Sequence, residues 1–276
     1  METAVVEKEA RKPGIIERLL VALGKPVGDF FSYVGGICIM TWNMIASYIK
    51  PPYDWREIII QIDYLGVRGL PIAIIASMFI GGVMVLQLSY SLATFGAKTF
   101  VGALLGIALV RWLSPVLMAL LLGGRVSAGI AAELGSMVIA EQIDAMRSLG
   151  ANPLKKLVAP RVIACTFFVF PITTMLADVL GIMGGLITAV VTTHQDPQFF
   201  MNNVRNYLDY KDIFSGWGKV FFFGYFIAII GCYQGLNTTG GTEGLGKSTT
   251  KTVVITMVTI LISDFFLTKF FFFLMG

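Results

Sequence analysis

The sequence predicts an all-α, polytopic membrane protein. Of its 276 residues, 56% are hydrophobic and only 14% are charged, and the mean hydropathy is +0.78, which is typical of membrane proteins. Several apolar stretches have the roughly 20 residues that a helix needs to cross a bilayer about 30 Å thick. A charged segment that is costly to place in lipid separates two of them. We therefore expect an N-terminal interfacial helix region, five transmembrane helices and one short cytoplasmic helix.

The N-terminal region, residues 1–60, is predicted to form a cytoplasmic tail followed by helices at the membrane surface. Residues 1–12 are charged and lack the apolar core and cleavage site of a signal peptide. Residues 15–23 place charges beside an apolar face, as in a helix that lies in the interface. Breaks follow at Lys25-Pro26, Asp29 and Gly35-Gly36, and the apolar residues 37–49 number only 13. We expect this last stretch to dip or lie flat rather than to span.

Residues 61–276 are predicted to form the membrane domain. Four stretches are long enough to span, namely 70–93, 100–122, 162–191 and 253–275, and a fifth, 220–236, is completed by residues 216–218. Glycines spaced by four let helix backbones approach closely, and they occur at 102/106, 181/185 and 231/235. Ser127, Ala131 and Gly135 continue this spacing beyond the second span. That continuation predicts one helix of roughly 60 Å, at 1.5 Å per residue.

The distribution of Lys and Arg predicts the orientation. With a cytoplasmic N-terminus, fifteen basic residues fall on the cytoplasmic side and five on the far side, with Arg111 left inside a span. Because cytoplasmic loops carry an excess of Lys and Arg, the N-terminus is predicted to be cytoplasmic and the C-terminus to emerge on the far side.

The charged segment between the second and third spans predicts a short amphipathic helix. Ile139, Ile143, Met146 and Leu149 fall on one helical face. The other positions carry Glu141, Asp144 and Arg147, and Gly150 and Asn152-Pro153 end the helix. A helix lying on the bilayer should be rich in Lys and Arg, whereas this one has two acids and one Arg. We favour a protein partner over the alternative of a surface helix on lipid.

Two long motifs resemble those of the MlaE/YrbE permease family. The first runs from Gly124 to Met137 and continues through residues 141–145, 150–153 and Pro160-Arg161; the second is 241–254 followed by Asp264. The resemblance extends from about Gly66 to the C-terminus. It implies that residues 61–276 are a permease domain of a homodimeric ABC transporter that moves phospholipids between the inner and outer membranes and so maintains outer-membrane lipid asymmetry. The chain would then reside in a bacterial inner membrane.

The same resemblance implies partners and cofactors. It implies a cytoplasmic ABC ATPase (MlaF-like) that holds ATP and Mg²⁺, a STAS-domain protein (MlaB-like) and a periplasmic MCE-domain protein (MlaD-like). No cofactor is expected on this chain, and neither enzyme activity nor nucleic-acid binding. By this resemblance the helix at 141–150 is similar to the coupling helix that docks on the ATPase, with Glu141, Ile143, Asp144, Met146, Arg147 and Leu149 as its contacts.

One departure from the family lies in the second span. The family pattern Arg-Glu-Leu-Gly-Pro is replaced here by Arg111-Trp112-Leu113-Ser114-Pro115, so the role of the acid cannot be transferred. An Arg inside a span is a candidate functional residue and can bind a phosphate through two hydrogen bonds. We expect an apolar lipid cavity that opens to the periplasm and is lined by Met84, Leu88, Leu92, Phe95, Leu104, Ala108, Arg111 and Trp112.

Other polar residues have simpler explanations. Asp178 and Asp264 also lie inside spans and are either functional groups or structural ion pairs. Residues 241–248 satisfy the letters of a P-loop, but a phosphate cradle needs a strand before it and a helix behind it; we expect a Gly-rich turn leading into a helix start at Thr249-Thr250 instead. His194 and the three cysteines lack metal-ligand spacing.

Two other functions remain open on the sequence alone. A proton-coupled secondary transporter could use Asp178 or Asp264, but it usually has paired inverted repeats, and five spans do not divide in that way. A non-transporting membrane anchor for an MCE-domain protein would need no lipid-binding site. A neighbouring ATPase gene distinguishes the first alternative, and bound lipid that depends on Arg111 distinguishes the second.

Overall fold

The computed structural model describes residues 15–49 and 54–275, and every regular element in this part of the chain is a helix. The predicted charged tail at 1–12 lies outside the described residues. In chain order the elements are α1 (Ile15–Tyr48), α2 (Trp55–Gln61), η1 (Ile62–Gly66), η2 (Val67–Gly69), α3 (Leu70–Ala93), η3 (Lys98–Phe100), α4 (Val101–Ala108), η4 (Leu109–Leu113), α5 (Ser114–Ile139), α6 (Gln142–Ser148), η5 (Leu154–Val158), α7 (Ala159–Ile163), η6 (Ala164–Val169), α8 (Phe170–Thr193), α9 (Pro197–Tyr207), α10 (Tyr210–Leu236) and α11 (Gly241–Met275).

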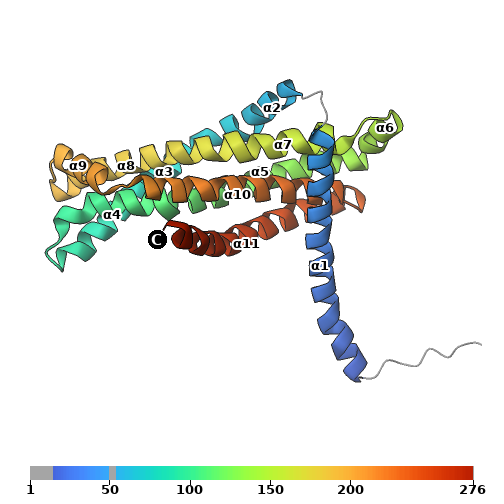
Figure 1. Ribbon diagram of the computed structural model, residues 1–276, viewed down its shortest axis with the longest axis horizontal. Coiled ribbons are helices and arrows are strands. Elements are labelled where there is room, and N and C mark those ends of the chain that lie inside the picture. Colours follow the sequence, from blue (N-terminus) through green and yellow to red (C-terminus); the bar gives the residue numbers. More distant parts are fainter. Residues whose placement is uncertain (1–14, 50–53, 276) are drawn as a thin grey trace, which may run out of the picture.

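Six helical segments of the described chain are long and apolar enough to cross a membrane. Five contain the predicted spans and extend beyond them: 55–93, 98–139, 154–193, 210–236 and 241–274. Together these five form a bundle along the long axis of the molecule, with α9 at one end and α6 at the other (Figure 1). The second span continues to Ile139 without leaving the helical path, as the small-residue spacing predicts.

The sixth segment, Gly28–Tyr48, belongs to α1 and corrects one prediction. The chain does not break at Gly35-Gly36, because Gly36 packs directly against the ring of Tyr233 on α10, where a Cβ atom would collide. Hydrogen bonds between Thr41 and Tyr225 (2.6 Å) and from Gln234 to Tyr33 (3.3 Å) fasten α1 to α10. In Figure 1, α1 runs across the bundle rather than along it, the direction expected of an interfacial helix.

Irregular turns inside the long helices have a common cause. Each of the stretches η1–η2, η4, η5 and η6 lies directly N-terminal to a proline, respectively Pro71, Pro115, Pro160 and Pro171. A proline has no N–H to donate to the carbonyl four residues earlier, and its ring collides with that carbonyl. Widening to a π-helical turn at η4, η5 and η6 relieves the collision without ending the helix, and before Pro71 a π-helical turn, η1, is followed by the 3-10 turn η2.

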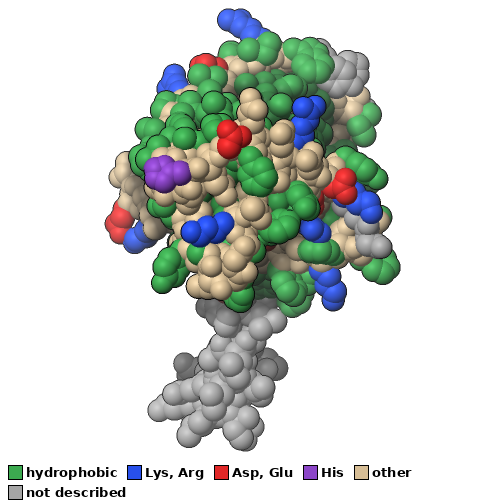
Figure 2. Space-filling view, turned by 90° about the vertical axis from the view of Figure 1, so that its left-hand side faces the viewer, with side chains coloured by type: hydrophobic (Ala, Val, Ile, Leu, Met, Phe, Trp, Pro, Cys, Tyr) green, Lys and Arg blue, Asp and Glu red, His purple; other side chains and the backbone are tan. Residues whose placement is uncertain are grey.

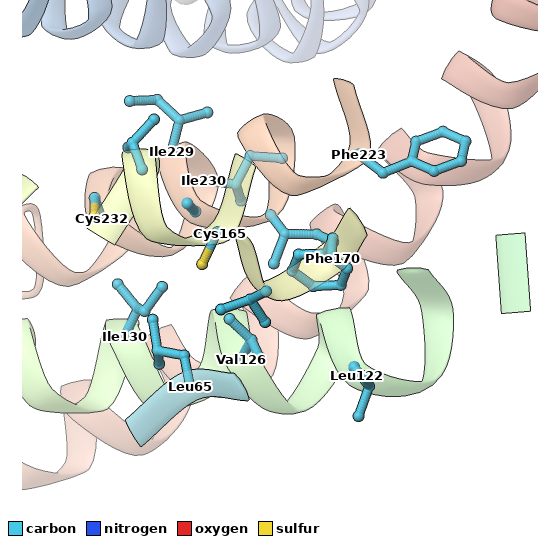
Figure 3. Close-up of a cluster of buried hydrophobic side chains, with 14 of the residues drawn as sticks. Leu65, Leu122, Val126, Ile130, Cys165, Phe170, Phe223, Ile229, Ile230 and Cys232 are labelled. Carbon is cyan, nitrogen blue, oxygen red and sulfur yellow. The ribbon is translucent and has the colours of Figure 1, made fainter. Parts of the chain in front are cut away.

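Small residues bring the central helices together. A Cβ atom on Gly231 would lie 2.9 Å from the carbonyl oxygen of Ser127, and one on Gly235 would lie 2.8 Å from Leu134. The predicted small-residue stripe of α5 therefore packs against the glycine pair of α10, as helix contacts in membranes require. Around this contact lies the main apolar core, which includes Leu122, Val126, Ile130, Cys165, Phe170, Phe223, Ile229, Ile230 and Cys232 (Figure 3). The buried cysteines act as small hydrophobic residues.

Candidate functional site

The first candidate site is centred on Arg111, in the π-helical turn η4. Pro115 follows Arg111 by four residues, so the carbonyl of Arg111 is the one that loses its helical N–H donor. The widened turn at this position is a frequent feature of functional sites. The site lies toward the α9 end of the bundle, because Asp212 in the first turn of α10 contacts Arg111.

Arg111 is engaged on one side and open on the other. Its guanidinium lies 3.5 Å from the carboxylate of Asp212 and 4.2 Å from the centre of the Phe272 ring on α11. Asp212 also accepts a hydrogen bond from the backbone N–H of Asp209. Its carboxylate therefore both caps the start of α10 and orients Arg111. Yet 34% of the Arg111 side chain remains exposed. A cation held by one carboxylate and one ring, with a free face, is suited to bind a second anion.

A second ion pair lies two turns further along α10. The ammonium of Lys219 lies 3.1 Å from the carboxylate of Asp264 and donates a hydrogen bond of 2.7 Å to the hydroxyl of Thr268, both on α11. Only 1% of the Lys219 side chain is exposed. Asp264, which the sequence left open between a functional and a structural role, is thus paired across two helices. The arrangement joins α10 to α11.

Asp178 lies on α8, in a different environment. It is buried and hydrogen-bonded to the hydroxyl of Ser114, the first residue of α5, while its Oδ1 atom has no partner among the described residues. A small apolar void lined by Ser77, Leu109 and Ala177 adjoins Ser114. Asp178 therefore contacts Ser114, three residues after Arg111 in the chain. This contact is separate from the Arg111–Asp212 ion pair.

The predicted lipid-contacting residues occupy two different surroundings. Met84, Leu88 and Leu92 on α3 pack, partly buried, against a smaller apolar cluster that includes Leu105, Leu109 and Phe200. By contrast, Leu104 and Trp112 are exposed on the same segment as Arg111, Ala108 is half-buried there, and Phe95 is exposed in the turn after α3. Within one copy of the chain, the outward surface around Arg111 is formed by Leu104, Ala108 and Trp112. The lipid-binding role of all eight residues stays a prediction.

The second candidate site is α6, at the opposite end of the bundle. Its helix ends as predicted: Gly150 adopts a left-handed conformation (φ 77°), and the N–H groups of Gly150 and Ala151 bond to the carbonyls of Arg147 and Met146, which is a Schellman motif. Glu141 enters the helix with φ 56°, a costly conformation for a residue other than glycine. Asn152 then accepts the N–H of Leu154 and donates to Ser47 of α1 (3.0 Å each).

The apolar face of α6 is divided between the fold and the surface. Ile143 is only 3% exposed and anchors the helix, Met146 is half-buried, and Leu149 is 86% exposed. The burial of Ile143 within the chain leaves it little surface to present to a partner, and the ATPase contact expected of Glu141, Ile143, Asp144, Met146, Arg147 and Leu149 stays a prediction. Asp144 and Arg147 pair with each other on the surface at 2.9 Å. On this face Leu149 is the most exposed apolar side chain, ahead of Ile139 at 37% and the half-buried Met146.

The P-loop-like residues 241–248 lie in the first two turns of α11. The helix begins at Gly241, eight residues before the predicted start at Thr249, and Lys247 pairs with Glu243 at 2.6 Å. In a helix the later backbone N–H groups of this segment bond to preceding carbonyls. The chain here is a helix start and not a loop wrapped around a phosphate.

Sequence reasoning missed two partners of Arg111 and the cation of the second ion pair. Lys219 was counted among far-side charges, whereas it is buried in the bundle, and Asp212 and Phe272 were not singled out. The seven-residue spacing of Asp212 and Lys219 places both on one face of α10, and this spacing was the available signal. Arg161, also counted as a cytoplasmic charge, is buried against Glu133 at 2.7 Å. Removing Lys219 and Arg161 leaves fourteen basic residues against four, so the predicted orientation is unchanged.

Comparison with known proteins now identifies the family. The family model described as Permease MlaE matches residues 58–270. The chain belongs to the MlaE permease family. A probable ABC transporter permease protein of Synechocystis is 41% identical over 228 residues, which cover 83% of this chain and 86% of the relative. A protein of the same description from Rickettsia felis is 35% identical over 251 residues, covering 91% and 96%.

A third relative carries a more specific name. The intermembrane phospholipid transport system permease protein MlaE of Haemophilus influenzae is 32% identical over 255 residues, which cover 92% of this chain and 97% of the relative. The family and the six apolar helices together make this MlaE-family chain a multi-pass membrane permease, the transport subunit of an ABC transporter.

Proposed function

We propose that this permease moves phospholipids between the inner and outer membranes of a bacterium, and that it thereby maintains outer-membrane lipid asymmetry. The observation that carries the proposal is the Arg111 side chain, which is one-third exposed and lies beside Phe272 near the α9 end. A phospholipid needs a cation for its phosphate and apolar walls for its acyl chains. The printed name of the Haemophilus relative supports the same substrate class.

The permease works as a homodimer in this proposal. Only 11% of the apolar stretch that could span the membrane in α11 is buried within the chain. The corresponding share is 61% for the segment 154–193 and 56% for α10. Phe272 of this helix lies against Arg111, and Arg111, Phe272 and the neighbouring Trp112 are all partly exposed. A second copy placed against α11 would enclose the open face of Arg111 in a cavity. The apolar cavity open to the periplasm thus forms between two chains.

Energy reaches the cavity from a separate cytoplasmic ABC ATPase, which binds ATP and Mg²⁺. We assign its docking to α6, where Leu149 is exposed and Asp144 and Arg147 border it. In this orientation the N-terminus and α6 are cytoplasmic and the chain resides in the inner membrane. A STAS-domain protein accompanies the ATPase, and an MCE-domain protein covers the opposite end. Figure 2 shows that end, where charged side chains of both signs are scattered among hydrophobic and small polar ones.

The decisive experiment measures phospholipid retained by the purified complex. Replacing Arg111 by Ala removes the phosphate-binding cation, and we expect at least a tenfold loss of co-purifying phospholipid, about 1.4 kcal/mol in affinity. Arg111→Lys keeps the charge but not the two-bond geometry and should lie between wild type and Arg111→Ala. Unchanged phospholipid in Arg111→Ala would contradict the proposal and favour the anchor alternative. Transport that persists in the absence of the ATPase would favour the secondary transporter.

A further inference from the structure

A second apolar hollow lies far from Arg111, between α1 and the bundle. We call it the α1–α10 groove; its volume is about 940 Å³, and its walls include Tyr48 of α1, Trp55 of α2, Ile163 of α7, Phe167 of η6, and Phe222 and Tyr225 of α10. It opens on the outer surface of the bundle, because Phe167 and Phe222 are both substantially exposed there. The transport proposal makes no use of this groove.

The chemistry of the walls selects an apolar occupant. The hydroxyl of Tyr225 is bonded to Thr41 at 2.6 Å, and Tyr48 also has a partner. The other polar groups of the lining are the hydroxyl of Thr166, whose oxygen is buried beneath the surface of the groove, and the indole N–H of Trp55. A polar ligand would lose its hydration here for few hydrogen bonds in return, whereas hydrocarbon has no hydrogen bonds to lose.

The size and shape favour hydrocarbon chains over a helix. Pockets for small ligands are typically about 300–1,000 Å³, and the groove falls in that range. A membrane-spanning helix, 30 Å long and 10–12 Å wide, occupies on the order of 3,000 Å³. The end of α1 lines the groove with Met44, Ile45 and Tyr48. Because α1 runs across the bundle (Figure 1), a straight helix parallel to the bundle that entered the groove would meet α1.

One end of the groove carries the residue types that are expected at the level of the lipid headgroups. Trp55 and Tyr48 lie there, and these residue types concentrate where hydrocarbon meets headgroups. Arg56, next in sequence to Trp55, is exposed, as is Lys156 just before α7. Basic side chains at this level attract anionic phospholipids. The same end of the bundle carries α6, which the proposed orientation places in the cytoplasm.

We infer that the α1–α10 groove holds the acyl chains of a phospholipid from the leaflet on the α6 side. This lipid is bound to the outside of the permease and is separate from the transported one. Among the described residues of one copy, α1, α2, α7, η6 and α10 provide the walls of this site.

Photolabelling tests this inference. The full-length permease, purified with its partners, is reconstituted with a phosphatidylglycerol that carries a diazirine in one acyl chain, and adducts are mapped by mass spectrometry. We expect adducts on Phe167 and Phe222 to exceed those on Ile187, an exposed residue of α8, by several fold. Ile163→Trp, which fills the groove, should lower the groove adducts several fold, and Ile187→Trp should not.

Two controls keep the test decisive. Phe222→Trp enlarges a side chain of the α10 wall and should lower the adducts on Phe167 as Ile163→Trp does, which guards against misfolding of one variant. Arg111→Ala, which tests the transported lipid, should leave the groove adducts unchanged, so the two proposals can fail separately. Equal adducts on the groove and on Ile187, adducts that persist in both Trp variants, or cross-links from the groove to a partner helix in place of lipid would each overturn the inference.

Discussion

Two ion pairs on α10 differ in ways that separate structure from function. Lys219 is paired with Asp264 at 3.1 Å, is hydrogen-bonded to Thr268 and is almost completely buried. Arg111 is paired with Asp212 at 3.5 Å, and a third of its side chain is exposed. Both pairs lie inside a membrane segment, and both join α10 to a neighbouring helix.

The difference shows that intramembrane charge alone does not mark a ligand site. A buried ion pair with satisfied hydrogen bonds has no capacity left for another partner, and breaking it leaves an uncompensated charge. An ion pair with one open face still has that capacity, because a guanidinium has five N–H donors. We therefore assign Lys219–Asp264 to stability and Arg111–Asp212 to lipid binding. Four predictions test this assignment, beginning with the largest expected effect.

Removing Lys219 should destabilise the permease most. Lys219→Met removes a buried cation and leaves the Asp264 carboxylate, 25% exposed, without its ion-pair partner; we expect a loss of about 2–3 kcal/mol in the free energy of unfolding, below the full cost of a buried unpaired charge. Thermal unfolding of the detergent-solubilised protein measures this loss. The double variant Lys219→Met/Asp264→Leu should recover much of it, since no charge remains unpaired. A double variant as unstable as the single one would show that packing, not charge, explains the effect.

Docking of the ATPase should depend on the exposed side of α6. Leu149→Glu places a charge where a partner would bury it unpaired, which costs at least about 2 kcal/mol, and should release the ATPase from the complex. Thermal stability of the permease itself should not change, because Leu149 makes little contact with the fold. A pull-down from detergent measures the ATPase stoichiometry, with Asn206→Glu, at the α9 end, as the matched control. Normal stoichiometry in Leu149→Glu would exclude this surface as the docking site.

Neutralising Asp212 should strengthen phospholipid binding at Arg111. Asp212→Asn removes the anion that competes for the guanidinium while it keeps a hydrogen-bonding group at the start of α10. We expect phospholipid retention to rise by a few fold, the opposite of Arg111→Ala, with about 1 kcal/mol or less lost in stability. Quantitative lipid analysis of the purified complex provides the measurement. A loss of lipid as large as that of Arg111→Ala would mean that the intact pair, and not the free face of Arg111, binds the substrate.

The smallest effect is expected at the surface pair of α6. Asp144 and Arg147 pair at 2.9 Å but are mostly exposed, and such pairs contribute about 0–1 kcal/mol. Arg147→Ala should therefore shift the unfolding temperature little, in contrast to Lys219→Met. Thermal unfolding in parallel with Lys219→Met tests this directly. A shift as large as that of Lys219→Met would break the link between burial and stability on which the comparison rests.

Much of the fold could be predicted because it depends on local chemistry. The spans follow from apolar length, and the start and end of α3 at Leu70 and Ala93 are those predicted. The end of α6 follows from Gly150, the residue best able to adopt the left-handed conformation that a Schellman motif needs. The contact between α5 and α10 follows from small residues spaced by four. The first two features depend on interactions within a few residues along the chain, whereas the third needs only a repeated spacing that is visible on each helix by itself.

What the sequence could not determine is which side of each helix is covered, and by what. Tertiary packing alone pairs Arg111 with Asp212, buries Lys219 beside Asp264, and turns Ile143 inward while Leu149 stays exposed. It also directs α1 across the bundle through Gly36 and Thr41, despite an apolar length that would allow a span. The physical reason is that hydrophobicity fixes whether a helix enters the membrane environment, whereas the rotation and direction of the helix are set by contacts between residues far apart in the chain.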